Sequence, residues 1–311
     1  MKIVFLGTPQ FAVPSLKALI EAGHDIPLVV TNPDRRQGRG NKVAAPAVKV
    51  AAESHDLPIL QIESIKSSDL KERLDELKPD LGVVVAFGHY LPKSIRKAPR
   101  LGIINVHASL LPRHRGAAPI SQAILDGDER YGVTIMKVAR RMDAGDVLSQ
   151  DSIPAESHHS CGSLTMLLAD LGGKLLAETV AKLETEPMNA SKQDESLATA
   201  VSKLTKSDGI LDWSQTAVHL ERQIRALNPW PMTRFQFNKK AVTVESASLE
   251  DSPNSGDPGT VLELSEHGIT VQTGKGQLVL TQVKPAGKKS MSAAAFARGR
   301  QLKVGGRLSN G

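Results

Sequence analysis

The chain has few of the residues that stabilise secreted proteins or cross membranes. Its 311 residues include one cysteine, Cys161, so an intramolecular disulfide is impossible and a reducing compartment is favoured. No apolar run approaches the roughly 20 residues of a membrane-spanning helix. The apolar start of the chain, residues 1–7, is too short for a signal peptide. We therefore expect a cytoplasmic protein.

Aromatic residues are also scarce, at 3% of the chain. Trp213, Trp230, Phe235 and Phe237 offer rings on which nucleic-acid bases can stack. With so few rings in the chain, packing in a hydrophobic core is the better interpretation of these four.

Acidic residues are missing from the end of the chain, where 8 Lys and Arg and no Asp or Glu follow His267. Residues 1–200 hold 24 basic and 24 acidic residues, whereas residues 201–311 hold 15 and 9 and so carry the whole net charge of +6. A region of one sign suits a polyanionic partner. Solvated basic surfaces are common too, and charge alone does not separate the two interpretations.

The patterns of the common cofactor sites are absent as well. Residues 7–9, Gly-Thr-Pro, follow the first predicted strand, where a dinucleotide-binding fold has several glycines. Only one glycine is present, so NAD is not expected. The single cluster of His and Cys, residues 158–161, lacks the ligand spacing of usual zinc sites, so no metal is expected either.

Hydrophobic residues make up 40% of the chain, enough for two globular domains. Strand-like and helix-like segments alternate in the first part, which predicts an α/β domain with a largely parallel sheet. Ser67 or Ser68 is the expected N-cap of the third helix. The predicted strands are 2–6, 26–31, 81–87, 103–106, 133–138 and 147–153, and the predicted helices are 13–22, 47–55, 70–77, 118–125 and 163–183.

The second part of the chain has a different pattern. Residues 184–206 are polar, contain Pro187 and lack strong periodicity, which predicts an interdomain linker. After this linker come several short predicted strands separated by Gly and Pro, a pattern that favours a small barrel or sandwich. A helix is predicted over 217–226, and the strands are predicted over 241–247, 259–264, 269–273 and 277–282.

Polar residues at the end of one predicted strand are suited to catalysis. Asn105 and His107 are two residues apart, so their side chains share one side of the strand. Asn offers neutral donors and acceptors, and His exchanges a proton near neutral pH. Asp143 lies in the Gly-containing segment Met142–Asp146 and can fold back to orient His107. A polar pair at a strand end can also serve only its own backbone, and both interpretations stay open at this point.

A polar segment, Asn32–Lys42, follows the second predicted strand and is expected to be a long loop. It holds four basic residues and one acidic residue, and loops in this position border the ligand crevice of α/β sheets. Basic side chains on a Gly-containing loop suit phosphate contacts. An ordinary mobile surface loop explains the same composition.

The stretch Asn105–Ile120, NVHASLLPRHRGAAPI, resembles the signature of the folate-dependent formyltransferases. The likeness extends over essentially the whole chain and, within that superfamily, is to the methionyl-tRNA formyltransferase family. His114 is a departure, since many members carry an aromatic residue there. The Asn105, His107 and Asp143 trio marks only the superfamily, whereas the Arg-rich loop and the second domain are specific. The other similar motifs are GTP at 7–9, NPD at 32–34, GRG at 38–40, AFG at 86–88, GVTIM at 132–136, NPWP at 228–231 and PAGKK at 285–289.

The resemblance implies an α/β fold. A Rossmann-like formyltransferase domain with a predominantly parallel sheet is expected over residues 1–189, a linker over 190–206 and an OB-like, tRNA-binding β-barrel over 207–311. It implies an enzyme that transfers a formyl group from 10-formyltetrahydrofolate to the α-amino group of methionyl-initiator tRNA, in translation initiation. No metal or NAD is expected as a cofactor, and neither a membrane nor an obligate protein partner is expected.

The resemblance also implies roles for single residues. Asn105 and a charged His107 would donate to the formyl oxygen. Asp143 would keep His107 charged and help to take the proton from the attacking nitrogen. Folate contacts are expected from Ser109, Leu110, Leu111, Pro112, Ala86, Phe87 and Gly88. Contacts with tRNA are expected from Arg35, Arg36, Arg39, Lys42, Lys203, Lys206, Lys288 and Lys289.

Three other functions compete with this one. A formyltransferase of the purine pathway, acting on a small amine, leaves residues 201–311 unexplained. An RNA-binding protein with an inactive α/β domain does not need the intact trio. A folate-binding regulator is the third. Formyl transfer to charged tRNA separates the enzyme from the binding modules.

Overall fold

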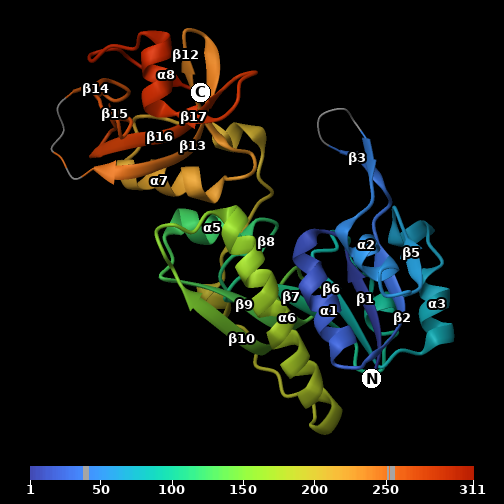
Figure 1. Ribbon diagram of the computed structural model, residues 1–311. Coiled ribbons are helices and arrows are strands. Elements are labelled where there is room, and N and C mark those ends of the chain that lie inside the picture. Colours follow the sequence, from blue (N-terminus) through green and yellow to red (C-terminus); the bar gives the residue numbers. More distant parts are fainter. Residues whose placement is uncertain (38–41, 251, 253–255) are drawn as a thin grey trace. The chain divides into compact units, whose positions relative to one another are not determined.

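The chain folds into two compact units (Figure 1). The structure, a computed structural model, describes residues 1–37, 42–250, 252 and 256–311. Each unit draws on several stretches of the chain. The first unit comprises Met1–Pro119, Arg130–Ala155 and Thr165–Val201, and the second comprises Ile120–Glu129, Glu156–Leu164 and Ser202–Gly311.

The helices and strands predicted up to residue 185 are present, with ends that differ by a few residues. In chain order the elements are β1 (Lys2–Gly7), the 3₁₀ turn η1 (Gln10–Ala12), α1 (Val13–Glu21), β2 (Asp25–Thr31), β3 (Arg35–Gln37), β4 (Lys42–Ala44), α2 (Ala47–Glu53), β5 (Ile59–Gln61), η2 (Ile65–Ser67), α3 (Leu70–Leu77), β6 (Leu81–Val85), α4 (Lys93–Arg96), β7 (Ile103–His107), β8 (Arg115–Gly116), α5 (Pro119–Asp126), β9 (Arg130–Lys137), β10 (Val147–Pro154), α6 (Cys161–Thr185), η3 (Glu195–Leu197) and β11 (Ala200–Val201).

The first unit is built on a seven-stranded sheet with the order β10-β9-β7-β6-β1-β2-β5. The strands from β7 to β5 are parallel, and β9 and β10 join the other edge antiparallel. In the register of the central strands, Phe5 lies between Val29 and Val83. The predicted Rossmann-like, predominantly parallel sheet is therefore confirmed.

Helices cover both faces of this sheet, because its central strands are apolar on both sides. One face packs Val4 and Leu6 of β1 against Leu70 and Leu74 of α3. On the other face α6 approaches closely at Gly172 and Gly173. A Cβ on Gly172 would lie 2.9 Å from Val106 of β7, and one on Gly173 would lie 3.0 Å from the backbone of Pro14 in α1.

The strand order reverses beside β1, since β2 lies on one side of it and β6 on the other. In open α/β sheets, ligands bind beyond the carboxyl ends of the strands at such a point. Here the turns that follow β1, β6 and β7 reach this end of the sheet together, and they contain residues 8–9, 86–88 and 108–114.

The second unit contains an antiparallel sheet with the order β14-β15-β16-β13-β12-β18, with β17 paired to β16. Its elements after residue 201 are η4 (Lys206–Gly209), α7 (Ala217–Ala226), β12 (Thr233–Phe237), β13 (Lys240–Glu250), β14 (Val261–Leu264), β15 (Ile269–Gln272), β16 (Gln277–Pro285), β17 (Met291–Ser292), α8 (Ala293–Arg300) and β18 (Ser309–Asn310).

The last residues of this sheet close it into a barrel of the OB-like type. Residues 305–310 bond to both of its edges. The Val261 amide donates to the Gly306 carbonyl and the Leu308 amide to the Gly259 carbonyl, both at 2.8 Å. Asn310 pairs in turn with Phe235 of β12.

The interior of the barrel confirms most of the predicted aromatic core. Trp213 and Phe235 are buried, and Phe237 packs against the same cluster. Trp230 was predicted to lie in the core and does not, since half of its surface is exposed.

Several local predictions were wrong for identifiable reasons. Asp69, not Ser67 or Ser68, is the N-cap of α3, because Ser67 belongs to the preceding 3₁₀ turn. The expected loop Asn32–Lys42 contains β3 and the first residue of β4, and these two strands pair antiparallel, with Arg36 opposite Val43. Strand β12 and helix α8 were not predicted.

The segment expected to be a linker is folded onto the first unit as far as Val201. Within it β11 pairs parallel with β8, so that Ala200 lies opposite Arg115 and Val201 opposite Gly116. A Cβ on Gly116 would lie 2.2 Å from the Val201 carbonyl oxygen, so only glycine allows this approach.

Candidate active site

The end of β7 carries the two polar residues predicted to act together. In the register of the sheet, Asn105 lies opposite Met136 of β9 and His107 lies opposite Thr134. His107 is buried and Asn105 is half-buried. Within the described part of the chain the Asn105 side chain makes no hydrogen bond, so its amide is available to a ligand.

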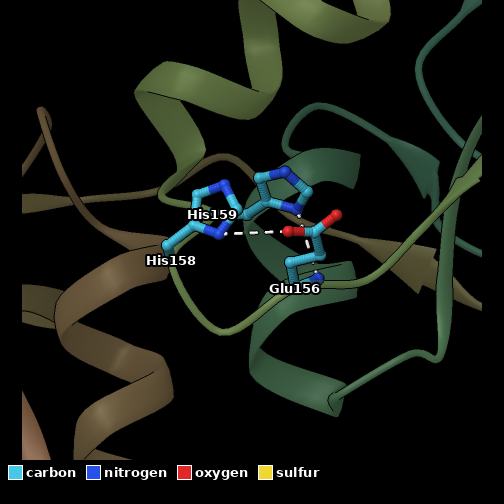
Figure 2. Close-up of side chains that lie close together, drawn as sticks. All are labelled: Glu156, His158 and His159. Atoms are coloured by element: carbon cyan, nitrogen blue, oxygen red, sulfur yellow. Dashed lines mark hydrogen bonds and ion pairs between the residues drawn. The ribbon is translucent and has the colours of Figure 1, made fainter.

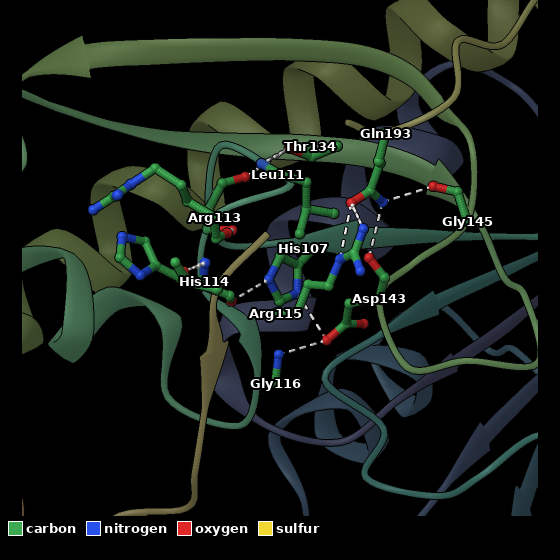
Figure 3. A network of polar contacts seen from close by, with 12 residues as sticks. His107, Leu111, Arg113, His114, Arg115, Gly116, Thr134, Asp143, Gly145 and Gln193 are labelled. Atoms are coloured by element: carbon green, nitrogen blue, oxygen red, sulfur yellow. Dashed lines mark hydrogen bonds and ion pairs between the residues drawn. The ribbon is translucent and has the colours of Figure 1, made fainter. Parts of the chain in front are cut away.

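The His107 ring lies between two acceptors (Figure 3). Its Nε2 is 3.0 Å from the carbonyl oxygen of His114, and its Nδ1 is 3.7 Å from Oδ2 of Asp143. Burial lowers the pKa of His107, while the Asp143 carboxylate and the His114 carbonyl act in the opposite direction. Burial thus works against the charged state that the resemblance implied, and Asp143 works for it.

Asp143 reaches His107 because its loop turns back sharply. The residue has φ 49°, in the left-handed region, and its Oδ2 accepts a hydrogen bond of 2.8 Å from the Gly116 amide. A Cβ on Gly145 would lie 1.7 Å from the Lys137 carbonyl oxygen, so glycine is required for the return of the chain. The structure therefore brings together His107 and Asp143, as the sequence predicted.

The expected folate loop, Ser109–Pro112, is held from behind by β9 and β10. Thr134 Oγ1 donates to the Ser109 carbonyl at 2.6 Å and accepts from the Leu111 amide at 3.1 Å. Gln150 Nε2 donates to the Leu111 carbonyl at 2.8 Å. Thr134 and Gln150 were not predicted as site residues, although Thr134 lies in the motif at 132–136. The loop is thus hydrogen-bonded at Ser109 and Leu111, and the backbone groups of Leu111 are already bonded.

The three expected folate residues in the turn after β6 differ in their exposure to solvent. Phe87 is buried in the core cluster of the first unit and stacks near His89, with ring centroids 4.8 Å apart. Ala86 and Gly88 are exposed and have φ 47° and 81°. The flanking residues, not the Phe87 ring, are therefore accessible to a ligand.

An unpredicted network of hydrogen bonds links the Asp143 loop to Gln193 and Arg115 (Figure 3). Gln193 Nε2 donates to the carbonyls of Asp143 and Gly145, at 2.9 and 2.7 Å. Arg115 donates to Gln193 Oε1 and forms an ion pair with Glu195. The polar, aperiodic sequence of residues 190–201 indicated a linker and gave no signal for these contacts.

Two family models match the chain: formyl transferase over residues 1–180, and formyl transferase, C-terminal domain, over residues 203–301. A methionyl-tRNA formyltransferase of Halalkalibacterium halodurans is 45% identical over 308 residues, which cover 98% of this chain and 97% of that protein. The chain belongs to the methionyl-tRNA formyltransferase family.

Solved structures of other proteins share the fold of this family member. An N-formyltransferase from Helicobacter canadensis, in complex with folinic acid and dTDP-3-aminofucose, has a TM-score of 0.67 at 17% identity and covers 90% of this chain and 98% of its own. HypX from Aquifex aeolicus, in complex with tetrahydrofolic acid, has a TM-score of 0.63 at 18% identity. The match covers 98% of this chain and 48% of the HypX chain.

Of the residues that the formyltransferase resemblance assigned to tRNA, those that the structure describes lie in both units and are exposed. Arg35 and Arg36 are on β3 and Lys42 begins β4, whereas Arg39 lies outside the described residues. The remaining four, all in the second unit, are Lys203, Lys206, Lys288 and Lys289. No helix of the described chain is long and apolar enough to cross a membrane.

One cluster in the second unit has the composition of a metal site. The ligand atoms of Glu156, His158 and His159 lie within 4.8 Å of one another (Figure 2). His158 Nδ1 is 3.2 Å from Glu156 Oε2, and His159 Nδ1 accepts from the Glu156 amide at 3.3 Å. Both histidines thus contribute contacts to the turn that precedes α6.

Proposed function

We propose that this chain transfers the formyl group of 10-formyltetrahydrofolate to the α-amino group of methionyl-initiator tRNA. The observation that carries the proposal is the buried His107–Asp143 pair beside the unbonded Asn105 amide. It occurs in a chain that aligns over 98% of its length with a methionyl-tRNA formyltransferase. The other relatives with folate in their structures support folate as the source of the formyl group.

Asn105 and His107 would stabilise the charge that develops during the reaction. Attack of a neutral amine on the formyl carbon moves electron density to the formyl oxygen. The Asn105 amide and an N–H group of His107 would donate to that oxygen, in a buried site where such bonds are strong. The stabilisation is available at once, because Asp143 and the His114 carbonyl already orient the imidazole.

His107 would also receive the proton of the attacking amine, and the Asp143 carboxylate would stabilise the resulting charge on the imidazole. In the free protein burial favours neutral His107, which can accept a proton. A negative formyl oxygen adds a second anion to the Asp143 carboxylate, and two nearby anions raise the pKa of the imidazole. His107 would therefore become an imidazolium as the charge that it stabilises appears, and it would return this proton to the folate nitrogen when the bond from that nitrogen to the formyl carbon breaks and tetrahydrofolate leaves.

The folate co-substrate supplies the formyl group when it is bound. The exposed turn at Ala86 and Gly88 and the loop Ser109–Pro112 would contact the folate, because both lie beyond the carboxyl ends of neighbouring strands. Phe87 supports that turn from the core.

The tRNA would be held by the second unit and by the hairpin of β3 and β4. The expected tRNA-binding domain, residues 207–311, carries an excess of basic residues, and Lys288 and Lys289 are exposed. Exposed cations bind phosphates without a fixed geometry. We assign the expected catalytic domain, residues 1–189, to chemistry and residues 207–311 to tRNA binding.

Mass spectrometry of charged tRNA after incubation with the protein and 10-formyltetrahydrofolate tests the proposal. We expect formylation of methionyl-initiator tRNA, and slower formylation of the elongator tRNA. His107→Ala should lose the activity, whereas His55→Ala, a control at an exposed histidine of the first unit, should keep it. Binding of tRNA without transfer would show a binding module instead.

A further inference from the structure

The segment Gln193–Val201, here called the clamp segment, crosses the two loops that form the reaction centre. It follows α6 in sequence and belongs to the first unit. Its first residue bonds to the Asp143 loop, and its last residues bond to the loop that follows β7. The segment therefore joins the carboxylate side of the site to the imidazole side.

Gln193 uses both ends of its side-chain amide. Its Nε2 donates to the carbonyls of Asp143 at 2.9 Å and Gly145 at 2.7 Å. Its Oε1 accepts from Nε of Arg115 at 3.0 Å and from Nη2 of Arg115 at 2.7 Å. One side chain thus fixes the backbone on both sides of the left-handed turn at Asp143 and connects it to β8.

Arg115 anchors this arrangement to buried structure. Its side chain is only 9% exposed and forms a two-pronged contact with Glu195, at 3.2 and 3.1 Å. Arg141 binds the same carboxylate at 2.6 Å. These hydrogen bonds from Arg115 and Arg141 lower the pKa of Glu195 to about 2, so the carboxylate stays charged at neutral pH.

The other end of the clamp segment holds the acceptor of His107. The His114 amide donates to Thr199 Oγ1 at 2.8 Å, and the Arg115 amide donates to the Thr199 carbonyl at 2.9 Å. The His114 carbonyl is the oxygen that lies 3.0 Å from His107 Nε2. Both partners of the imidazole, one on each ring nitrogen, are therefore placed by one segment.

We propose that Gln193 is a positioning residue of the formyl transfer reaction, which acts by fixing the Asp143 carboxylate against His107. The proposal rests on the proposed function for its kinetic effect. Gln193 touches no reacting atom in this arrangement. Its four hydrogen bonds fix the backbone that carries Asp143, and small displacements of a catalytic group cost large factors in rate.

A double-mutant cycle tests whether Gln193 acts through Asp143. Gln193→Leu should lower kcat about 10- to 100-fold and change KM for either substrate less than about twofold, because the reacting groups are displaced while the binding surfaces remain. In an Asp143→Asn background the same change should alter kcat less than about twofold. Additive effects, or a kcat unchanged by Gln193→Leu alone, would overturn the proposal.

Two further variants separate positioning from loss of folding. Gln193→Glu keeps an acceptor for Arg115 but loses both donors to the carbonyls, and should lower kcat as Gln193→Leu does. Gln122→Leu is the matched control, because it removes a glutamine that bonds to Asp126 on α5. It should leave kcat unchanged, and thermal unfolding should show that all variants are folded.

The pKa of His107, measured by NMR on the histidine ring, gives a readout that does not need activity. Asp143 raises this pKa in the wild type, so a displaced carboxylate should make it lower in Gln193→Leu. An unchanged His107 pKa in the folded variant would refute positioning. If the wild type failed to formylate any tRNA, the proposed function would fail, yet this measurement would still test the role of Gln193.

Discussion

The reaction centre that we propose and the basic surface of this protein are organised in opposite ways. His107 and Asp143 are largely buried, and each is held by backbone or side-chain partners at defined positions. Arg35, Arg36 and Lys42 are exposed, and none of their side chains makes a hydrogen bond or ion pair within the described parts of the chain. Formyl transfer depends on geometry, whereas binding of a polyanion depends on the number of accessible charges.

This contrast predicts two kinds of mutational response. Loss of a group in the reaction centre should reduce kcat by a large factor that salt does not change, because buried interactions are screened little. Loss of a surface cation should reduce affinity by a small factor that depends steeply on salt.

The largest expected effect is at the trio. Asn105→Ala, His107→Ala and Asp143→Ala should each lower kcat about 100-fold or more, because each removes an oxyanion donor or an acid–base group. Their effects should not add, since the three act as a unit. Steady-state kinetics at low and moderate salt measures this. A variant whose activity returned at low salt would place its residue with the surface cations.

Arg39, which lies outside the described residues, sharpens the comparison, because a basic residue that binds tRNA can need geometry too. Arg39→Ala should lower kcat/KM on methionyl-initiator tRNA about tenfold, and Arg39→Lys nearly as much, since lysine keeps the charge but lacks the planar fork of donors. Folate affinity should not change. Full activity of Arg39→Lys would show that charge alone matters, and Arg35→Lys serves as the control.

A smaller effect is expected on the barrel. Lys288→Ala combined with Lys289→Ala should weaken tRNA binding a few-fold and reduce the slope of log Kd against log salt by about 1 to 2. The kcat at saturating tRNA should stay the same. Filter binding at several salt concentrations gives the slope, and an unchanged slope would remove these residues from the tRNA surface.

The smallest effect concerns stability. The pKa of Glu195 is about 2 in the folded protein, against 4.5 for an ordinary glutamate, so its ion pairs contribute stability above pH 4.5 that is lost as the pH falls towards 2. Glu195→Gln should therefore lower Tm at pH 7 by no more than about 2 °C, since the group is exposed. The difference from wild type should shrink between pH 4.5 and 2.5. A constant difference would mean that the carboxylate is not the origin.

The sequence predicted the parts of the fold that depend on local pattern. Strands β1, β2, β6 and β7 are largely apolar runs, and α1, α3 and α7 have clear helical periodicity, so these elements were found with small errors at their ends. The short edge strand β5 of the same sheet was not predicted. Strand β12, with the sequence TRFQF, is short and weakly patterned, and it depends on pairing with β13 and β18. Such pairing is not encoded locally.

The site shows the same limit. Asn105 and His107 are two residues apart on one strand, so their juxtaposition followed from strand geometry alone, and Asp143 stood in a recognisable glycine-containing loop. Gln193 lies in an aperiodic polar segment, and its partners Arg115 and Gly145 are far from it in sequence. Only the folded chain shows that the segment expected to be a linker contacts the loop that carries Asp143.

The closure of the barrel by residues 305–310 has a consequence for synthesis on the ribosome. Until these residues have emerged, the backbone groups of β12 and of residues 259–261 that they cover are open edges. Open edges of a β-sheet pair readily with other chains, and an incomplete domain can pair in this way until its last strand has been synthesised. The nascent second unit is therefore most prone to aggregation just before its final strand arrives, when the first unit has all of its own chain available.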